Sequence, residues 1–503
     1  MNEVMQSVRL FRPELALTAA LLLVVLVDAA GGRSWRNGVS RLLTVGGLAV
    51  ALALCLPLRG RAAALFSGMV VLDPLSLFFK VLLIGASLLV LLIFTFRNSR
   101  ELHGQSQGEF YALLLAVTLS NVLLASSNDL AMLYLSLEMV SITSYVMVAY
   151  VKADRQPSEA ARLSNEASLK YVLFGAVSTG AMLYGLSLLY GLAGTTSLPL
   201  IRDYLAAGVT ETNRLAVVLV TLLVLAGFGF KTAVVPFHFW CPDVYQGAPT
   251  PVTAFLSVAP KAAGFAIMLR FFSQGMATGT GWELSGALDW PRLLMVVSVA
   301  TMTVGNVAAL TQTNMKRLLA YSSIAHAGFL MMGVVALSAN GARALLVYLL
   351  AYVFMNLGAF FVVTLVHHHE GTFDLRDYPG LYRRAPGLTV AMAVFMFSLM
   401  GIPPLVGFMG KLYVFAAVIE RGPSYWWYAV AGALNAALAA FYYARVLKTM
   451  IIDAPSEEKP PLRLALPDAA WVLVLAAANV LPLLLWSHVE RWARASLDLY
   501  ATR

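Results

Sequence analysis

Charged residues and cysteines are scarce in this sequence. Of its 503 residues only 12% are charged, and the two cysteines, Cys55 and Cys241, lie far apart. A soluble protein of this length would need far more polar residues to cover its surface. Because two such cysteines form neither a metal-ligand pattern nor a redox pair, we interpret them as small buried residues. There is also no Walker loop, no dinucleotide fingerprint and no CxxC pair, so we expect no nucleotide, flavin, haem or iron–sulfur site on this chain.

Long apolar runs are the dominant feature. The chain is 60% hydrophobic with a mean hydropathy of +0.77, and runs of about 18 or more apolar residues, enough to cross about 30 Å of hydrocarbon, recur along it. This pattern predicts an all-α polytopic membrane protein. The run after Arg9 and Arg12 is expected to be an uncleaved first helix, because many spans follow it. We predict fourteen spans, at residues 13–30, 40–57, 72–96, 108–125, 129–150, 168–193, 214–236, 250–270, 292–312, 318–337, 344–366, 387–419, 425–447 and 467–487.

Two of the predicted spans are interrupted. The seventh contains GFGFKTAVVPFHFW (Gly227 to Trp240), where Pro236 must break the helical hydrogen bonds. The twelfth contains GIPPLVGFMGK (Gly401 to Lys411), with Pro403 and Pro404. Broken helices at membrane depth are tolerated where they face protein or water, and a corresponding pair of them indicates an inverted-repeat transporter. Spans four to eight and nine to thirteen hold five helices each, and an odd number inverts the second copy.

Basic residues indicate the orientation of these spans. Lysine and arginine are more frequent in the loops after odd-numbered spans, counting Arg445 and Lys448 at the end of the thirteenth. The positive-inside rule puts that side in the cytoplasm and both termini outside. Since the net charge of +9 is spread over short loops, topology explains it better than nucleic-acid binding. We divide the chain into transmembrane helices 1–3 (1–107), a core of two repeats (108–450) and a final helix with its tail (451–503).

A few charged residues lie inside the apolar spans. A charge in hydrocarbon costs from about 3 to more than 10 kcal/mol, depending on how it is estimated. A chain that keeps several is expected to move ions or protons through the membrane. Alternatives are a neutral, hydrogen-bonded glutamic acid and a lysine that only caps a broken helix. The residues are Glu138, Lys170, Lys231, Lys261 and Lys411.

Two further lysine positions are less clear. Lys170 lies near a predicted span end, where an interfacial role is also reasonable. Lys80 lies outside the two repeats, and we expect it to extend to the interface or to serve a local structural role.

For the deeper groups a Glu–Lys pair suits proton transfer. Charges about 4 Å apart at an effective dielectric near 20 interact by about 4 kcal/mol, and lysine, unlike arginine, can release its proton.

Histidines offer candidate relays between these lysines. His326 lies among small and hydroxyl residues of the tenth span, and His238 follows Pro236 between two aromatic residues. Each is either a proton relay or a satisfied core histidine. The run from His367 to His369 points to different faces of one helix, so we expect an interfacial helix end there and no metal site.

Four segments resemble the antiporter-like subunits of complex I. They are Gly227 to Phe265, Asn314 to Phe329 (NMKRLLAYSSIAHAGF), Gly401 to Phe415 and Glu166 to Gly180 (EASLKYVLFGAVSTG). The last is especially similar to the subunit N (subunit 2) family of bacterial proton-translocating NADH–quinone oxidoreductase. The resemblance covers about residues 70–450. The chain end near 503 leaves no room for the long lateral helix expected of subunit L, and Lys411 stands where subunit M is expected to have glutamate.

The resemblance implies a fold, a function and roles for particular residues. The fold would be fourteen helices with two inverted five-helix repeats. Glu138 and Lys231 would be the coupled pair, Lys261 the central relay and Lys411 the exit-side group, while Lys170 would have a less defined role. Electrons would pass from NADH through FMN and iron–sulfur clusters to quinone on other subunits, with no cofactor on this chain. The chain would pump protons in the bacterial cell inner membrane, beside other membrane subunits of complex I.

Other functions remain open from the sequence. A multisubunit sodium/proton antiporter shares the motifs of the seventh and eighth spans, although EASLKYVLFG favours subunit N. A second alternative is a membrane subunit of an energy-converting hydrogenase, which belongs to a different enzyme class. A purely structural anchor would leave the buried charges without a purpose.

Overall fold

The computed structural model describes residues 2–30, 33–152, 158–207, 211–278, 283–284, 290–455 and 460–497. Parts of the predicted connections (153–157, 208–210, 279–282, 285–289 and 456–459) and of the predicted tail (498–503) lie outside the described residues. In the first half the helices are α1 (Asn2–Leu10), α2 (Arg12–Ala30), α3 (Arg33–Cys55), α4 (Pro74–Ile93), α5 (Gln107–Ser126), α6 (Leu130–Val148), α7 (Glu159–Ala193), α8 (Leu198–Ala206), α9 (Glu211–Thr232), α10 (Trp240–Gly247) and α11 (Thr250–Arg270).

The second half is also helical. Its helices are α12 (Trp290–Ala309), α13 (Met315–Val335), α14 (Ala339–Glu370), α15 (Leu381–Arg384), α16 (Pro386–Met400), α17 (Val406–Ile419), α18 (Trp426–Ile451), α19 (Leu466–Ala478) and α20 (Trp486–Ala495). The described strands form two small antiparallel hairpins, β1 (Ala63–Leu65) with β2 (Val70–Leu72) and β3 (Ala277–Thr278) with β4 (Glu283–Leu284).

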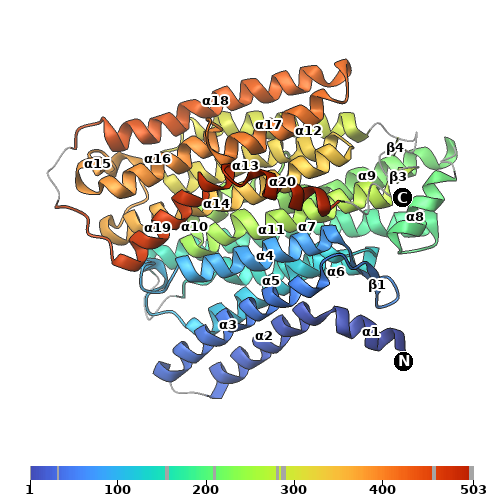
Figure 1. Cartoon of the computed structure of the whole chain (residues 1–503), viewed down its shortest axis with the longest axis horizontal. Helices are drawn as coiled ribbons and strands as arrows, with labels where there is room; N and C mark the ends of the chain where they lie inside the picture. Colours follow the sequence, from blue (N-terminus) through green and yellow to red (C-terminus); the bar gives the residue numbers. More distant parts are fainter. Residues whose placement is uncertain are drawn as a thin grey trace.

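The described helices confirm the predicted number of spans. Thirteen of them are long and apolar enough to cross a membrane, and they run roughly alongside one another (Figure 1). The shorter apolar helices α16 and α17 together make the interrupted twelfth span, which gives the fourteen that the sequence predicts. The protein is therefore a multi-pass membrane protein.

Both predicted helix breaks are present. The first lies between Thr232, the end of α9, and Trp240, the start of α10, and its first residue, Ala233, has a left-handed φ of 58°. The second lies between Met400, the end of α16, and Val406, the start of α17. Pro236, Pro403 and Pro404 occupy these breaks, because a proline nitrogen cannot donate a helical hydrogen bond.

A third break was not predicted. We expected a final span at 467–487 followed by a tail. The span is confirmed, since Leu466–Leu483 is long and apolar enough to cross a membrane, but its helix α19 ends at Ala478 and a further helix, α20, begins at Trp486. Pro482 lies in the gap, and the Asn479 carbonyl accepts a hydrogen bond from the Val406 amide of α17 at 3.1 Å instead of continuing a helical ladder. The break after α19 is therefore hydrogen-bonded to the start of α17.

Helix α20 contacts three other helices. The Trp486 indole donates to the Tyr413 hydroxyl of α17 at 2.9 Å. Glu490 pairs with Arg343 of α14 at 3.2 Å. Further along, the Trp492 ring lies 4.5 Å from the Phe78 ring of α4. The end of the chain thus connects the second repeat to the N-terminal helices.

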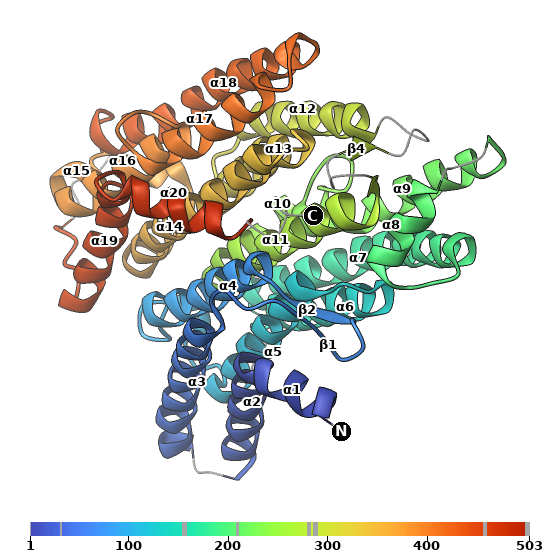
Figure 2. The same ribbon diagram turned by 45° about the vertical axis from the view of Figure 1, so that its right-hand side comes forward.

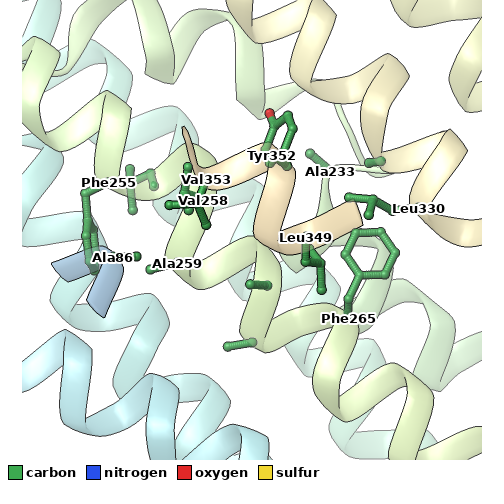
Figure 3. Close-up of a cluster of buried hydrophobic side chains, with 14 of the residues drawn as sticks. Ala86, Ala233, Phe255, Val258, Ala259, Phe265, Leu330, Leu349, Tyr352 and Val353 are labelled. Carbon is green, nitrogen blue, oxygen red and sulfur yellow. The ribbon is translucent and has the colours of Figure 1, made fainter. Parts of the chain in front are cut away.

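The core lies around α11. All of its residues are buried, and it packs on α4 and α5 on one side and on α13 and α14 on the other. Figure 2 shows it between the blue-to-green helices and the yellow-to-orange helices. In the close-up, Phe255 and Val258 of α11 lie among Val353 of α14 and Ala86 of α4 (Figure 3). A charged residue on α11 is therefore held at the centre of the molecule.

Candidate functional site

Lys231 lies beside the first helix break, as the next-to-last residue of α9. Its side chain is only 3% exposed, and its Nζ donates a hydrogen bond to the Ser141 hydroxyl of α6 at 3.3 Å. The Phe230 carbonyl at the break accepts from the Ala233 amide at 3.2 Å and from the Trp240 indole at 3.0 Å. Within the described residues, Lys231 therefore meets a hydroxyl of a neighbouring helix and does not cap the broken one.

Glu138 lies one helical turn before Ser141 on α6. It is half-buried and acts electrostatically on Lys231. The two charged groups form no direct ion pair in the part of the chain that the structure describes. The predicted Glu138–Lys231 pair is therefore placed on two helices, α6 and α9, and the Ser141 hydroxyl of α6 contacts Lys231.

Lys261 lies in the middle of α11, directly after Pro260. Its Nζ donates to the Ser323 backbone carbonyl at 2.8 Å and to the Ser323 hydroxyl at 2.5 Å. The Tyr352 hydroxyl of α14 also donates to the Ser323 hydroxyl, at 2.9 Å. One turn beyond Lys261, a side chain placed at Gly264 would come within 3.3 Å of the Lys231 stem. The two lysines thus lie on contacting surfaces of α9 and α11.

His326 lies between two tyrosine hydroxyls. Its Nδ1 lies 2.8 Å from the Tyr348 hydroxyl and its Nε2 lies 3.1 Å from the Tyr443 hydroxyl. The Tyr443 hydroxyl also lies 2.5 Å from the Ser322 hydroxyl. His326 lies within electrostatic reach of both Lys261 and Lys411. A neutral imidazole has one donor and one acceptor nitrogen, and a hydroxyl can fill either role. The hydrogen bonds around His326 can therefore reverse their direction of donation.

Lys411 lies in α17, just after the second break. Its Nζ donates to the Leu399 and Met400 carbonyls at 3.0 and 2.8 Å, and it lies 4.8 Å from the centre of the Phe329 ring. A side chain at Gly401 would come within 2.8 Å of Lys411 Cδ. Freed carbonyls therefore hold this ammonium group, as the broken helix allows.

Two predicted residues lie apart from these contacts. His238 is in the first break, and its Nδ1 is buried without a hydrogen-bond partner among the described residues. Lys170 lies on the outside of α7, where its side chain is 38% exposed and pairs with Glu166 at 2.7 Å and Asp243 at 2.8 Å. Arg317 also pairs with Asp243, at 2.5 Å. Burial opposes ionisation of Asp243, but Lys170 and Arg317 hold the pKa of its carboxyl below the ordinary value.

Several polar residues were missed by sequence reasoning. We expected Lys80 to extend to the interface or to serve a local role; the extension is wrong, because Lys80 is fully buried and pairs with Glu14 of α2 at 2.7 Å. Glu14 lies inside the first predicted span, and this was the signal that could have identified the pair. The hydroxyls of Ser141 and Ser323 carry no such signal, since single serines are common in membrane helices.

A second missed group lies at the loop between α4 and α5. Glu101 accepts hydrogen bonds from the Thr250 amide and hydroxyl at 2.7 and 2.6 Å, and it pairs with Lys316 at 3.0 Å. Lys316 also donates to the Ala248 carbonyl at 2.6 Å. This cluster fixes the start of α11 and therefore the height of Lys261.

The fold and these buried lysines define an antiporter-like membrane subunit. Residues 127–439 match the family described as NADH:quinone oxidoreductase/Mrp antiporter, TM, and the chain belongs to this family. The matched residues include Glu138, Lys231, Lys261 and Lys411, whereas Glu14 lies outside them.

Comparison with individual proteins shows to which subunit family within this class the chain belongs. The NADH-quinone oxidoreductase subunit N of Anaeromyxobacter sp. (strain Fw109-5) is 45% identical over 523 residues, which cover 99% of this chain and 98% of that protein. The chain is accordingly a member of the subunit N family of NADH–quinone oxidoreductases, and the resemblance drawn from its motifs is confirmed. A chain of respiratory complex I from Thermus thermophilus with bound aureothin has a TM-score of 0.77 at 32% identity, covering 95% of this chain and 98% of that one.

The alternative of a sodium/proton antiporter is not favoured by these comparisons. A chain of the Mrp complex from Dietzia sp. DQ12-45-1b has a TM-score of 0.84, covering 98% of both chains. Its identity is 20%, so the similarity shows a shared fold alone.

Proposed function

We propose that this chain conducts protons as a membrane subunit of NADH–quinone oxidoreductase, and that Glu138, Lys231, Lys261 and Lys411 carry them. Two observations support this most: Lys261 is hydrogen-bonded to Ser323, and the hydroxyl groups around His326 lie within electrostatic reach of both Lys261 and Lys411. Burying lysines in a membrane is energetically costly, and a protein that served only as a structural anchor would have no need for them.

The first step takes place between Glu138 and Lys231. A carboxylate that moves nearer to or farther from an ammonium group changes how tightly that group holds its proton, by about 4 kcal/mol at about 4 Å and an effective dielectric near 20. The Ser141 hydroxyl can donate or accept, so it can serve Lys231 with or without its proton. Movement of α6 relative to α9 would therefore load and unload Lys231.

The next steps cross from α9 to α17. Lys231 and Lys261 meet at the contact around Gly264, where water would carry the proton between the two amines. From Lys261 the proton would pass through Ser323 and the tyrosine hydroxyls to His326. Gly410, which precedes Lys411, packs on the Tyr348 ring, so the relay ends beside Lys411.

Lys170 would have a positioning role in this scheme. Its ion pair with Asp243 joins α7 to α10, and Arg317 joins α13 to the same carboxylate. The three helices surround the first break. We infer that this cluster keeps α10 in place while the break changes shape.

The redox chemistry would belong to other subunits. NADH, FMN, iron–sulfur clusters and quinone would bind there, and quinone reduction would drive the proton through this chain. The chain would lie in the bacterial inner membrane, and the bias of basic residues supports both termini outside. Isolation of the tagged chain in mild detergent tests this: a complex with flavin, iron–sulfur clusters and NADH–quinone activity is expected, and a colourless complex of membrane subunits alone would contradict it.

The proton path is tested by Lys231→Ala in the assembled complex. We expect insertion and assembly to be retained and NADH-driven proton uptake by proteoliposomes to be abolished. Lys448→Ala is the control, because Lys448 pairs at the surface with Asp453 at 2.7 Å. If assembled Lys231→Ala pumped at the normal rate, the role of Lys231 would be wrong.

A further inference from the structure

A cavity of about 390 Å³ lies where α20 meets the first turns of α4, outside the proton path. One wall is apolar, with Pro74, Leu77 and Phe78 of α4 packed near Trp492 of α20. The opposite wall is the turn at residues 59–62, which contributes Arg59 and Arg61. The cavity therefore has an apolar side and a cationic side. Its size is within the range of about 300–1,000 Å³ that is typical of ligand pockets.

The two arginines have no acidic partner. Both are exposed, and neither forms an ion pair or a side-chain hydrogen bond with any residue that the structure describes. The nearest acidic residue along the chain, Asp73, is already bound by both terminal nitrogens of Arg270, at 2.9 and 3.0 Å. Two guanidinium groups are thus left for a ligand of opposite charge, and guanidinium geometry matches phosphate.

The cavity lies at the ends of membrane spans. The second span ends at Leu58, directly before Arg59, and α4 begins at Pro74. Tryptophan is enriched at the membrane–water interface, where its ring lies at the level of lipid head groups. The arginines are therefore at phosphate height, and the apolar wall extends from there toward the hydrocarbon.

We propose that this cavity binds an anionic phospholipid, with its phosphate on Arg59 and Arg61 and an acyl chain along the half-buried Leu77 and Trp492. A lipid satisfies both walls at once, whereas a free phosphate would leave the aromatic wall in water. The bound lipid would fill the junction between α20 and α4 and hold the end of the chain against the N-terminal helices.

A second surface groove provides an internal comparison. It has a volume of about 640 Å³ and lies along the first turns of α16 and the side of α19. Its arginine, Arg384, already pairs with Glu370. This groove should therefore accept acyl chains without preference for charge.

The test uses the assembled complex in nanodiscs that contain a photoactivatable phospholipid. The label is a diazirine on the acyl chain of either phosphatidylglycerol or phosphatidylcholine, and crosslinked peptides are mapped by mass spectrometry. Each basic residue near an anionic lipid strengthens binding by about fivefold. We expect phosphatidylglycerol to label the peptides around Leu77 and Trp492 several-fold more than phosphatidylcholine, and Arg59→Ala/Arg61→Ala to remove the preference.

Controls keep the proposal falsifiable. Arg491→Ala/Arg494→Ala removes two exposed arginines of α20 that do not line the cavity, and it should keep the preference. Labelling of the α16–α19 groove should be equal for the two lipids in every variant. Equal labelling of the cavity in the wild type, or a preference that survives the double substitution, would overturn the proposal. Loss of labelling in excess inorganic phosphate would show that the head group alone is recognised, which also contradicts a lipid-specific site.

Discussion

Lys231 and Lys411 stand beside the two helix breaks but bond to different kinds of partner. Lys231 donates to the Ser141 hydroxyl of another helix, whereas Lys411 donates to the Leu399 and Met400 carbonyls of its own broken span. A neutral amine keeps two N–H donors and gains a lone pair, so it can still donate to carbonyls, but only a hydroxyl can also donate to the lone pair. The partner of Lys231 can therefore serve the amine both as acceptor and as donor, whereas the carbonyls beside Lys411 only accept, and the two repeats are not equivalent.

Ser141→Ala should weaken proton pumping without unfolding the protein. The substitution removes the hydrogen bond to Lys231, and a bond to a charged group is worth about 1.5–3 kcal/mol, which corresponds to a change in rate of at least about tenfold. Ser141→Thr keeps the hydroxyl and should retain most of the activity. The measurement is NADH-driven proton uptake by proteoliposomes of the assembled complex. Proton uptake by Ser141→Ala equal to that of the wild type would show that Ser141 does not take part.

Gly401→Ala should displace Lys411. Gly401 has a φ of +86°, and an added Cβ would come within 2.8 Å of Lys411 Cδ. A left-handed backbone costs a residue with a side chain about 1–2 kcal/mol, and the lysine must also move. Gly387→Ala is the matched control, because Gly387 in the same span has open space around it. We expect a lower melting temperature and loss of proton uptake in Gly401→Ala alone.

The breaks were predictable because their cause is local. Pro236 and Pro404 cannot complete a helical ladder wherever the rest of the chain goes, and a lysine in an apolar run is visible in the sequence. The third break has Pro482, but a single proline near a span end is a weak signal. The contact from Val406 to Asn479 that accompanies it comes from another helix.

Partners across helices could not be predicted. Ser323 and Tyr443 reach the Lys261–His326 region from positions that one sequence does not relate to it, since only the tertiary packing of α11, α13, α14 and α18 brings them together. The same holds for the pairing of Lys170 with Asp243, 73 residues away. A pattern along one helix indicates which residues are buried, and it contains no information on which helix covers them.

Tyr443→Phe tests the relay beyond Lys261. The change removes the hydroxyl that lies between His326 and Ser322 and leaves the ring. Tyr428→Phe is the matched control on the same helix, since its hydroxyl donates to Ser298 at 2.7 Å, away from these contacts. Tyr443→Phe loses two buried hydrogen bonds and Tyr428→Phe loses one, each worth about 0.5–1.5 kcal/mol. Both melting temperatures should fall modestly, with slower proton uptake only in Tyr443→Phe; equal uptake would exclude Tyr443 from the relay.

Glu101 should make the protein sensitive to acid. Burial opposes its ionisation, but Lys316 and two hydrogen bonds from Thr250 hold the pKa of Glu101 below its ordinary value of 4.5. A lowered pKa contributes stability that is fully present above pH 4.5 and is lost as the pH falls through the folded value. The melting temperature of the wild type should therefore decrease as the pH is lowered below 4.5.

Glu101→Gln should flatten this part of the pH profile. At neutral pH it leaves Lys316 buried without its carboxylate, at a cost of about 3–5 kcal/mol. Glu109→Gln is the control, because its partner Lys152 is 61% exposed and surface pairs contribute about 0–1 kcal/mol. An acid-sensitive profile that persists in Glu101→Gln would assign the effect to another group.

The Glu14–Lys80 pair should stabilise the N-terminal helices without carrying protons. Both side chains are fully buried and 2.7 Å apart, so Lys80→Met alone leaves an uncompensated charge and should cost about 3–5 kcal/mol. Glu14→Leu/Lys80→Met replaces the pair with apolar groups and should recover most of that loss, which a double-mutant cycle of melting temperatures measures. Because the pair lies outside the residues that match the antiporter family, protons pumped per quinone reduced should be normal in the double variant. Loss of pumping in a stable, assembled double variant would instead place Glu14 and Lys80 on the proton path.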